Sequence, residues 1–198
     1  MSRVIAVVFL ALVATGCSGN GDAGPTAKPD AVVANAPQIT MALGNAHVVG
    51  AAPGVTASGR VDFVTGADTL TVAGLKKDAA PFGVTEPAAM IDLLRGVVDV
   101  KAYGGAEVQG EGTKRYEVDI NLPKAIAATP PTRRADLQKL NGVVGADEKL
   151  WADVFIDKSG RVRRILIPVH TASNRPYGED QTEPQEVSVD YSNFGSAR

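Results

Sequence analysis

Alternation of apolar and polar residues along two segments constrains the fold of this chain more than any other feature of its sequence. The first segment runs from Thr56 to Val64, and its apolar positions include Ala57, Val61 and Phe63. The second runs from Thr113 to Leu122, with apolar residues at Tyr116, Val118, Ile120 and Leu122. Successive side chains of a β-strand point to opposite faces, so each segment predicts a strand with one dry face. Such strands are typical of antiparallel sheets.

Further strands are predicted in the second half of the chain. The segments 150–157 and 161–169 are rich in Val, Ile and Leu, and the sequence Asp157-Lys158-Ser159-Gly160 joins them. Gly160 can adopt the positive φ that a short hairpin loop requires. Segment 186–192 alternates again, whereas 68–72, 97–104 and 106–110 are weaker strand patterns, and the pair Gly104-Gly105 is typical of a turn. Together these segments predict a meander of antiparallel strands.

Helical patterns are fewer. Pro87 suits the first turn of a helix that Gly96 ends, and a second helical region covers 123–129 and 132–140, broken by Pro130-Pro131. A weaker helix is predicted for 37–46, with Ile39, Leu43 and Ala46 as its buried stripe. The expected fold class is therefore α+β, with one long antiparallel sheet and a few helices on one of its faces.

The amino-terminal segment has the pattern of an export signal. Arg3 precedes an uncharged run of eleven residues from Val4 to Ala14, about half of the roughly 20 residues that span a bilayer as a helix. The exit sequence Ala14-Thr15-Gly16-Cys17 resembles the bacterial lipobox. That resemblance implies cleavage between Gly16 and Cys17 and acylation of Cys17, the only cysteine in the chain. The alternative is a plain secretory signal followed by a free thiol.

These patterns divide the chain into three parts. Residues 1–16 form the expected signal peptide, residues 17–36 an acylated cysteine with a Gly-, Ala- and Pro-rich tether, and residues 37–198 a single domain. Without Arg3 the chain has 19 basic and 22 acidic residues, and this balance argues against binding nucleic acid. Aromatic residues make up only 5% of the chain, so the core must consist mainly of aliphatic side chains.

An ordered set of segments resembles a known family. The sequence EGTKRYEVDINLPKAIA, the polar helix TRRADLQKL and the hairpin WADVFIDKSGRVRRILIPV follow one another as in actinobacterial lipoproteins of the LppX and LprG type. Those proteins belong with the lipoprotein carriers LolA and LolB, and the resemblance covers roughly residues 55–192. It implies a strongly curved, incomplete half-barrel that wraps a few helices, with an apolar cavity for acyl chains between sheet and helices.

The alternation gives candidate residues for such a cavity. The predicted inward-facing positions are Val61, Phe63, Ile91, Leu94, Tyr116, Val118 and Ile120. An acyl chain gains about 0.8 kcal/mol per buried CH₂ group, so a cavity walled by aliphatic side chains can bind one. The Ala-rich helices can also pack tightly against the sheet. In that alternative the same residues form an ordinary filled core.

No catalytic, metal-binding or cofactor-binding motif emerges. The two histidines, His47 and His170, lack cysteine partners for a zinc site, and no Gly-x-Ser-x-Gly sequence is present. The acidic segment 177–186 does not match a calcium-binding loop. Three arginines, Arg161, Arg163 and Arg164, are expected either to keep the sheet soluble or to meet anionic headgroups. Trp151 is expected to close one end of the barrel or to line a cavity mouth.

The sequence thus predicts a non-enzymatic lipoprotein, anchored by Cys17 to the extracytoplasmic face of the cell membrane. Its expected role is to bind or shuttle an acylated or otherwise hydrophobic ligand. The alternative is a structural lipoprotein with a filled core that binds a protein partner in the cell envelope.

Overall fold

Eight β-strands form the larger part of the structure, a computed structural model that describes residues 27–74, 82–144, 150–169 and 185–196. The strands are β1 (Asn45–Ala52), β2 (Val55–Asp62), β3 (Asp68–Gly74), β4 (Val97–Val108), β5 (Glu111–Ile120), β6 (Leu150–Asp157), β7 (Val162–Val169) and β8 (Gln185–Ser192). They make one sheet in the order β3-β2-β1-β8-β7-β6-β5-β4, and every pair of neighbours is antiparallel. The predicted meander is confirmed.

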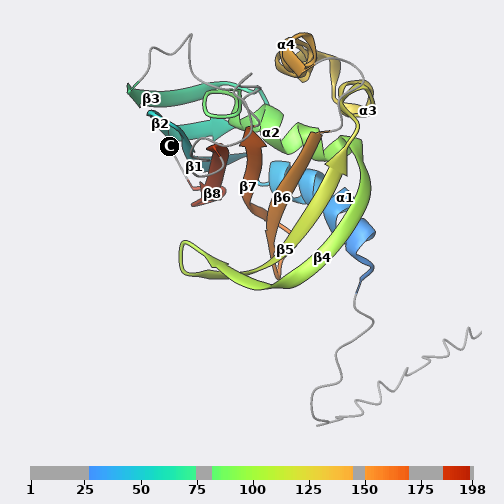
Figure 1. The fold of residues 1–198 in the computed structure, drawn as a ribbon. Helices are drawn as coiled ribbons and strands as arrows, with labels where there is room; N and C mark the ends of the chain where they lie inside the picture. Colours follow the sequence, from blue (N-terminus) through green and yellow to red (C-terminus); the bar gives the residue numbers. More distant parts are fainter. Residues whose placement is uncertain (1–26, 75–81, 145–149, 170–184, 197–198) are drawn as a thin grey trace, which may run out of the picture.

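The sheet is curved and open. Its edge strands are β3 and β4, which lie at opposite ends of the strand order and do not pair with each other. In Figure 1 the strands β4 to β8 bend around the helix that begins the described chain, so the sheet resembles part of a barrel wall. The predicted α+β half-barrel is therefore confirmed.

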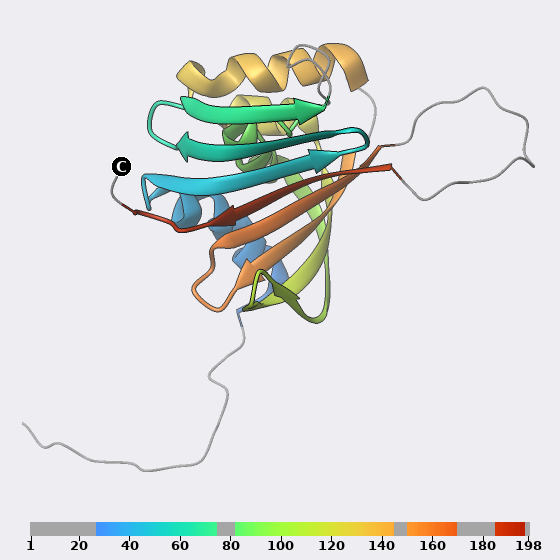
Figure 2. The same cartoon turned by 90° about the vertical axis from the view of Figure 1, so that its left-hand side faces the viewer.

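The described residues also form four α-helices and two short 3₁₀ turns. They are α1 (Pro29–Met41), α2 (Pro87–Leu93), η2 (Leu94–Gly96), α3 (Leu122–Ala128), η3 (Pro131–Arg133) and α4 (Arg134–Val144). Both α1 and α2 begin with proline, which has no backbone N–H to leave unbonded at that position. The Asn121 side chain caps α3 by accepting a hydrogen bond from the N–H of Lys124 at 2.8 Å. Figure 2 shows α1 (blue) and α2 (green) behind the strands.

One hydrophobic core joins the helices to the sheet. Helix α1 contributes the stripe Val33, Ala36, Pro37 and Thr40, which has the i, i+3, i+4, i+7 spacing of a single helix face. All seven residues proposed for a cavity lie in this core, and none is more than 4% exposed. The seven positions predicted to face inward are therefore all buried.

The boundary between tether and domain was wrong in the sequence analysis. Residues 29–36 belong to α1, whereas Ala46 lies in β1 and not in a helix over 37–46. The Ala- and Pro-rich composition suggested a tether, but the apolar stripe of α1 packs on the core. Burial of that stripe stabilises a helix that contains an internal proline, Pro37.

The interpretation of Gly104-Gly105 as a turn was also wrong. Segments 97–104 and 106–110 form one long strand, β4, and the pairing register shifts between Ala102 and Gly105. A shift of this kind bends a strand and increases its twist. The reversal comes later, at Gln109 and Gly110, which both have positive φ.

A buried ion cluster holds the helices together. Asp92 of α2 is fully buried and accepts hydrogen bonds from Arg95 Nε at 2.7 Å and from Arg133 Nε at 2.9 Å. The Met41 sulfur, at the end of α1, lies 3.2 Å from Nη2 of Arg133. The cluster therefore joins α1, α2 and η3.

Several predicted features lie outside the described residues. These are the cleavage site at Gly16 and Cys17, His170, and residues 177–184 of the acidic segment.

Candidate functional site

A groove of about 1000 Å³ opens between α1, the β4–β5 hairpin and the turn that joins β6 to β7. The groove is lined by residues of three segments. Helix α1 and the residues just before it contribute Ala27, Ala31, Val32, Asn35 and Ile39. The β4–β5 hairpin contributes Gly105, Ala106, Glu107, Gly112, Thr113, Lys114 and Tyr116, and the end of β6 with the following turn contributes Ile156, Asp157, Lys158, Ser159 and Gly160. Its volume lies at the upper end of the range of about 300–1,000 Å³ that is typical of ligand sites.

Small residues create the space in the groove. On the hairpin side the wall is built from Gly105, Ala106 and Gly112, next to the register shift of β4. On the helix side it is built from Ala27 and Ala31, with the larger Val32 and Ile39. Apart from Asn35, the side chains that line the groove from α1 are therefore aliphatic.

The β6–β7 turn is rigidly organised. The Asp157 carboxylate accepts hydrogen bonds from the N–H groups of Ser159 at 2.9 Å and Arg161 at 3.1 Å, and from Arg161 Nε at 2.7 Å. Gly160 has a φ of +80°, and a Cβ atom there would lie 2.8 Å from Ile39 Cδ1. This φ favours glycine, and a Cβ atom here would require the end of the Ile39 side chain to shift.

Thr40 fixes the position of α1 over the sheet. Its buried hydroxyl donates to the Ala36 carbonyl at 2.7 Å and accepts from the N–H of Val162 at 2.9 Å. This contact joins the helix wall of the groove to β7, directly after the β6–β7 turn.

Tyr116 is the one predicted cavity residue that lines the groove. It lies on β5, opposite Ala102 of β4 and Val154 of β6, and is 4% exposed. Burial raises the pKa of its hydroxyl, so the side chain stays neutral at pH 7. The other six candidates belong to the packed core beneath and do not line this groove.

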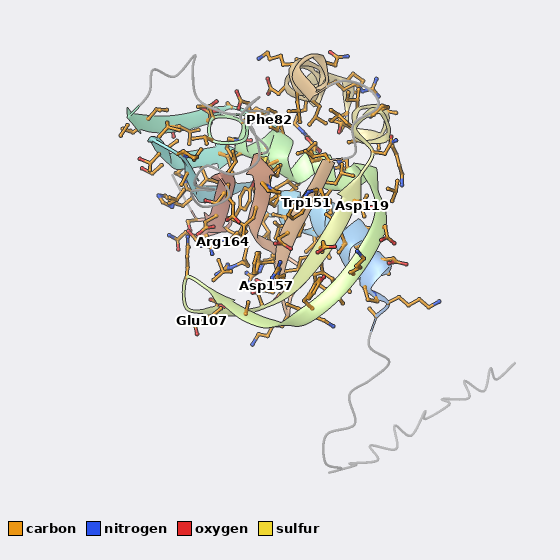
Figure 3. All side chains as sticks on the ribbon, in the orientation of Figure 1. Phe82, Glu107, Asp119, Trp151, Asp157 and Arg164 are labelled. Carbon is orange, nitrogen blue, oxygen red and sulfur yellow. The ribbon has the colours of Figure 1, made fainter. Side chains whose placement is uncertain are left out.

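The charged groups of the groove differ in how they are paired. Figure 3 shows Asp157 at the end of β6 and Glu107 near the end of the β4–β5 hairpin. Asp157 is neutralised by Arg161, as described above. Lys114, Lys158 and Glu107 also line the groove, and none of them forms an ion pair within the described part of the chain.

The three arginines of the predicted hairpin are held by acidic neighbours and do not line the groove. Arg161 pairs with Asp157; Arg164 pairs with Asp190, with Nη2 and Oδ2 2.6 Å apart; and Nη2 of Arg163 lies 3.6 Å from Glu111. The hydrogen bonds that Arg164 donates to the Asp190 carboxylate raise the pKa of Arg164. All three arginines therefore lie next to carboxylates of the domain, although the buried Nε of Arg163 has no hydrogen-bond partner among the described residues.

Trp151 does not line the groove either. It is the second residue of β6 and lies opposite Asp119 of β5 (Figure 3). It is 37% exposed, whereas the following inward position, Ala152, is fully buried. The alternation of the strand thus places the indole on the outer face of the sheet.

Two further features of the described residues bear on function. These residues contain no cluster of three or more His, Cys, Asp or Glu side chains able to hold a metal ion. Within the same ranges, no helix is long and apolar enough to span a bilayer.

Comparisons with known proteins identify a fold. No family model matches this sequence, and no curated protein matches it. Among solved structures, LprF from Mycobacterium bovis superimposes with a TM-score of 0.51 at 12% identity, covering 89% of this chain and 97% of LprF. The Mycobacterium tuberculosis lipoprotein LppX gives a TM-score of 0.49 at 16% identity, covering 85% of this chain and 96% of LppX. The domain therefore has the open half-barrel fold of LprF, and the resemblance expected from the sequence is confirmed at the level of the fold.

Proposed function

We propose that this protein is an extracytoplasmic lipoprotein whose groove under α1 binds the apolar chain of a lipid or lipidated ligand. The observation that carries the proposal is the groove itself, which is open and is lined along α1 by Ala31, Val32 and Ile39. Each CH₂ group moved from water into such a site contributes about 0.8 kcal/mol. Binding would need no covalent chemistry.

The proposed anchor places the groove near a membrane. Cys17 precedes Ala27, which lines the groove, by ten residues. Ten residues span at most about 35 Å, so a domain anchored at Cys17 would keep this groove close to the bilayer surface. Two or more acyl chains on one cysteine give stable anchoring, whereas a single chain binds only reversibly.

Replacement of Cys17 should release the protein from the membrane. We expect the Cys17→Ala variant, expressed in a bacterium that processes lipoproteins, to leave the membrane fraction, because the anchor has no other attachment point. A Ser18→Ala variant serves as the control and should fractionate like the wild type. Cell fractionation and intact-mass measurement give the result. A Cys17→Ala protein that stays in the membrane fraction would contradict the anchoring proposal.

Filling the groove should abolish ligand binding. Ala31 lines the groove, whereas Ala34, which is also exposed on the same helix, lines a different pocket. We expect Ala31→Trp to weaken binding of a fluorescent acyl ester at least tenfold, the equivalent of losing about two buried CH₂ groups. The matched variant Ala34→Trp should bind within about twofold of the wild type. Fluorescence titration of residues 17–198 carrying Cys17→Ser measures both affinities, and equal affinities would exclude this groove as the site.

A second candidate function is favoured by the packing of the core. The predicted cavity positions other than Tyr116 fill the interior, while Val98, Tyr103 and Trp151 on β4 and β6 are 56%, 43% and 37% exposed. A lipoprotein with this surface would act as an interaction module in the envelope. Failure of the wild-type protein to bind any acyl probe, by titration and by native mass spectrometry, would favour this alternative.

A further inference from the structure

The Tyr116 hydroxyl is a polar group on the groove wall that has no hydrogen-bond partner within the described part of the chain. The residue is more than nine-tenths buried, being 4% exposed. The hydroxyl itself is not among the buried unpaired polar atoms of the described residues, where only Arg163 Nε is found, so it can be reached from the groove. The Tyr191 hydroxyl, by contrast, is used inside the fold, where it donates to the Pro87 carbonyl at 2.7 Å. Tyr116 therefore offers a donor that a bound molecule can use.

A cation lies beside this donor. The ammonium group of Lys114 is 5.7 Å from the centre of the Tyr116 ring, and both residues line the groove. A contact of this length holds an ammonium loosely over an aromatic face and leaves its protons available. Lys158, on the β6–β7 turn, brings a second exposed ammonium group to the same groove.

Four charged side chains line the groove, Lys114, Lys158, Glu107 and Asp157, and their formal charges cancel. Asp157 is already paired with Arg161, which leaves two lysines and one glutamate without an ion-pair partner in the described part of the chain. An anionic head can pair with either lysine, whereas a neutral head cannot.

We infer that the groove binds a single-chain amphiphile with a singly charged anionic head, which Tyr116, Lys114 and Lys158 recognise while the chain lies along α1. This inference rests on the proposed function, which it extends from an apolar ligand to a defined class of ligand. A carboxylate and a phosphodiester share the required charge and hydrogen-bond acceptors. The raised pKa of Tyr116 supports this role, because a neutral phenol donates its proton to an anion.

The test compares the same acyl chain with a charged and with an uncharged head group. Residues 17–198 carrying Cys17→Ser are titrated with cis-parinaric acid and with its methyl ester, which fluoresce on entering an apolar site. We expect the acid to bind roughly three- to tenfold more tightly than the ester, the gain typical of two partly exposed charge contacts. This preference should shrink as salt is raised from 0.05 to 0.5 M.

Three variants assign the preference to the named groups. Tyr116→Phe removes only the hydroxyl, and the double variant Lys114→Gln and Lys158→Gln removes both cations. Each should weaken binding of the acid and leave binding of the ester within about twofold. Lys139→Gln, on exposed α4 and away from the groove, is the matched control and should change neither affinity. Thermal unfolding of each variant checks that the fold is intact.

The outcomes separate this inference from the proposed function. The inference of an anionic head group is wrong if acid and ester bind equally well. It is also wrong if the preference for the acid persists in both Tyr116→Phe and the double lysine variant. In either case the proposal that the groove binds an apolar chain is unaffected. Binding of neither probe would overturn the proposed function as well. Competition with oleic acid and with lysophosphatidylglycerol then distinguishes a carboxylate head from a phosphodiester, with monooleoylglycerol as the neutral competitor that should displace the probe least.

Discussion

Replacing Asp92 with alanine is expected to lower the free energy of unfolding by about 3–5 kcal/mol, because the variant leaves two partly buried guanidinium groups without their common counterion. Arg133 and Arg95 are only 13% and 24% exposed, and both bind the fully buried carboxylate. Urea denaturation monitored by circular dichroism measures the loss. Since the cluster joins α1, α2 and η3, the loss should appear in the cooperative unfolding of the whole domain.

A matched surface pair provides the control for Asp92. Asp136 pairs with Lys139 on α4 at 3.0 Å, but both side chains are solvent-exposed. Removing this carboxylate should change the stability by less than about 0.5 kcal/mol, as for other exposed ion pairs. If Asp92→Ala and Asp136→Ala destabilise the protein equally, the buried cluster does not stabilise the helices in the way described.

The second large effect is expected at Phe63. Its side chain is 1% exposed, packs against the Tyr191 ring with centroids 6.5 Å apart, and belongs to the central core. Phe63→Ala should cost about 3–5 kcal/mol, since the surrounding aliphatic residues can only partly collapse into the space. Denaturant titration at constant m-value provides the measurement.

The adjacent residue, Val64, provides a matched control for the Phe63 prediction. Val64 is adjacent in sequence but 73% exposed, so Val64→Ala should change stability by less than about 0.5 kcal/mol. A small loss for Phe63→Ala would mean that the interior tolerates a large void. Such a result would favour the adaptable cavity that the family resemblance implies, in place of the filled core.

The strands were predictable because their signal is local. In β2 and β5 the alternation of side chains places Val61, Tyr116, Val118 and Ile120 on the dry face, and a shift of one residue would expose all of them. The hairpin between β6 and β7 was equally clear, because Gly160 has the positive φ that its turn requires. Where alternation is strict, sequence alone therefore defined the sheet.

The amino-terminal part of helix α1, residues 29–36, was missed because its apolar stripe is short and its composition resembles that of a linker. The buried positions Val33, Ala36, Pro37 and Thr40 have helical spacing, but only one of them is a large aliphatic residue. Alanine and proline dominate the segment, and its stability depends on contacts with distant strands. Pro29 at the first helical position was the local signal that could have identified this helix.

The groove could not be predicted from sequence spacing. Its walls come from three segments that are far apart in the chain, and its space depends on how α1 rests on the β6–β7 turn through Ile39 and Thr40. Alternation identified Tyr116 as inward-facing but could not show that, of the seven predicted positions, it alone borders open space. Lys114 was overlooked because an exposed lysine on a strand is ordinarily a solvated residue.

The pairing of β1 with β8 has a consequence for how the chain folds. These two strands, about 140 residues apart in sequence, form the seam between β3-β2-β1 and β7-β6-β5-β4. Among the described residues, no backbone hydrogen bond joins β3-β2-β1 directly to β7-β6-β5-β4, so these two parts of the sheet pair with each other only through β8. During synthesis from the amino terminus, the sheet would thus be completed only after β8 has been made. Pairing between strands so far apart in sequence predicts slow folding.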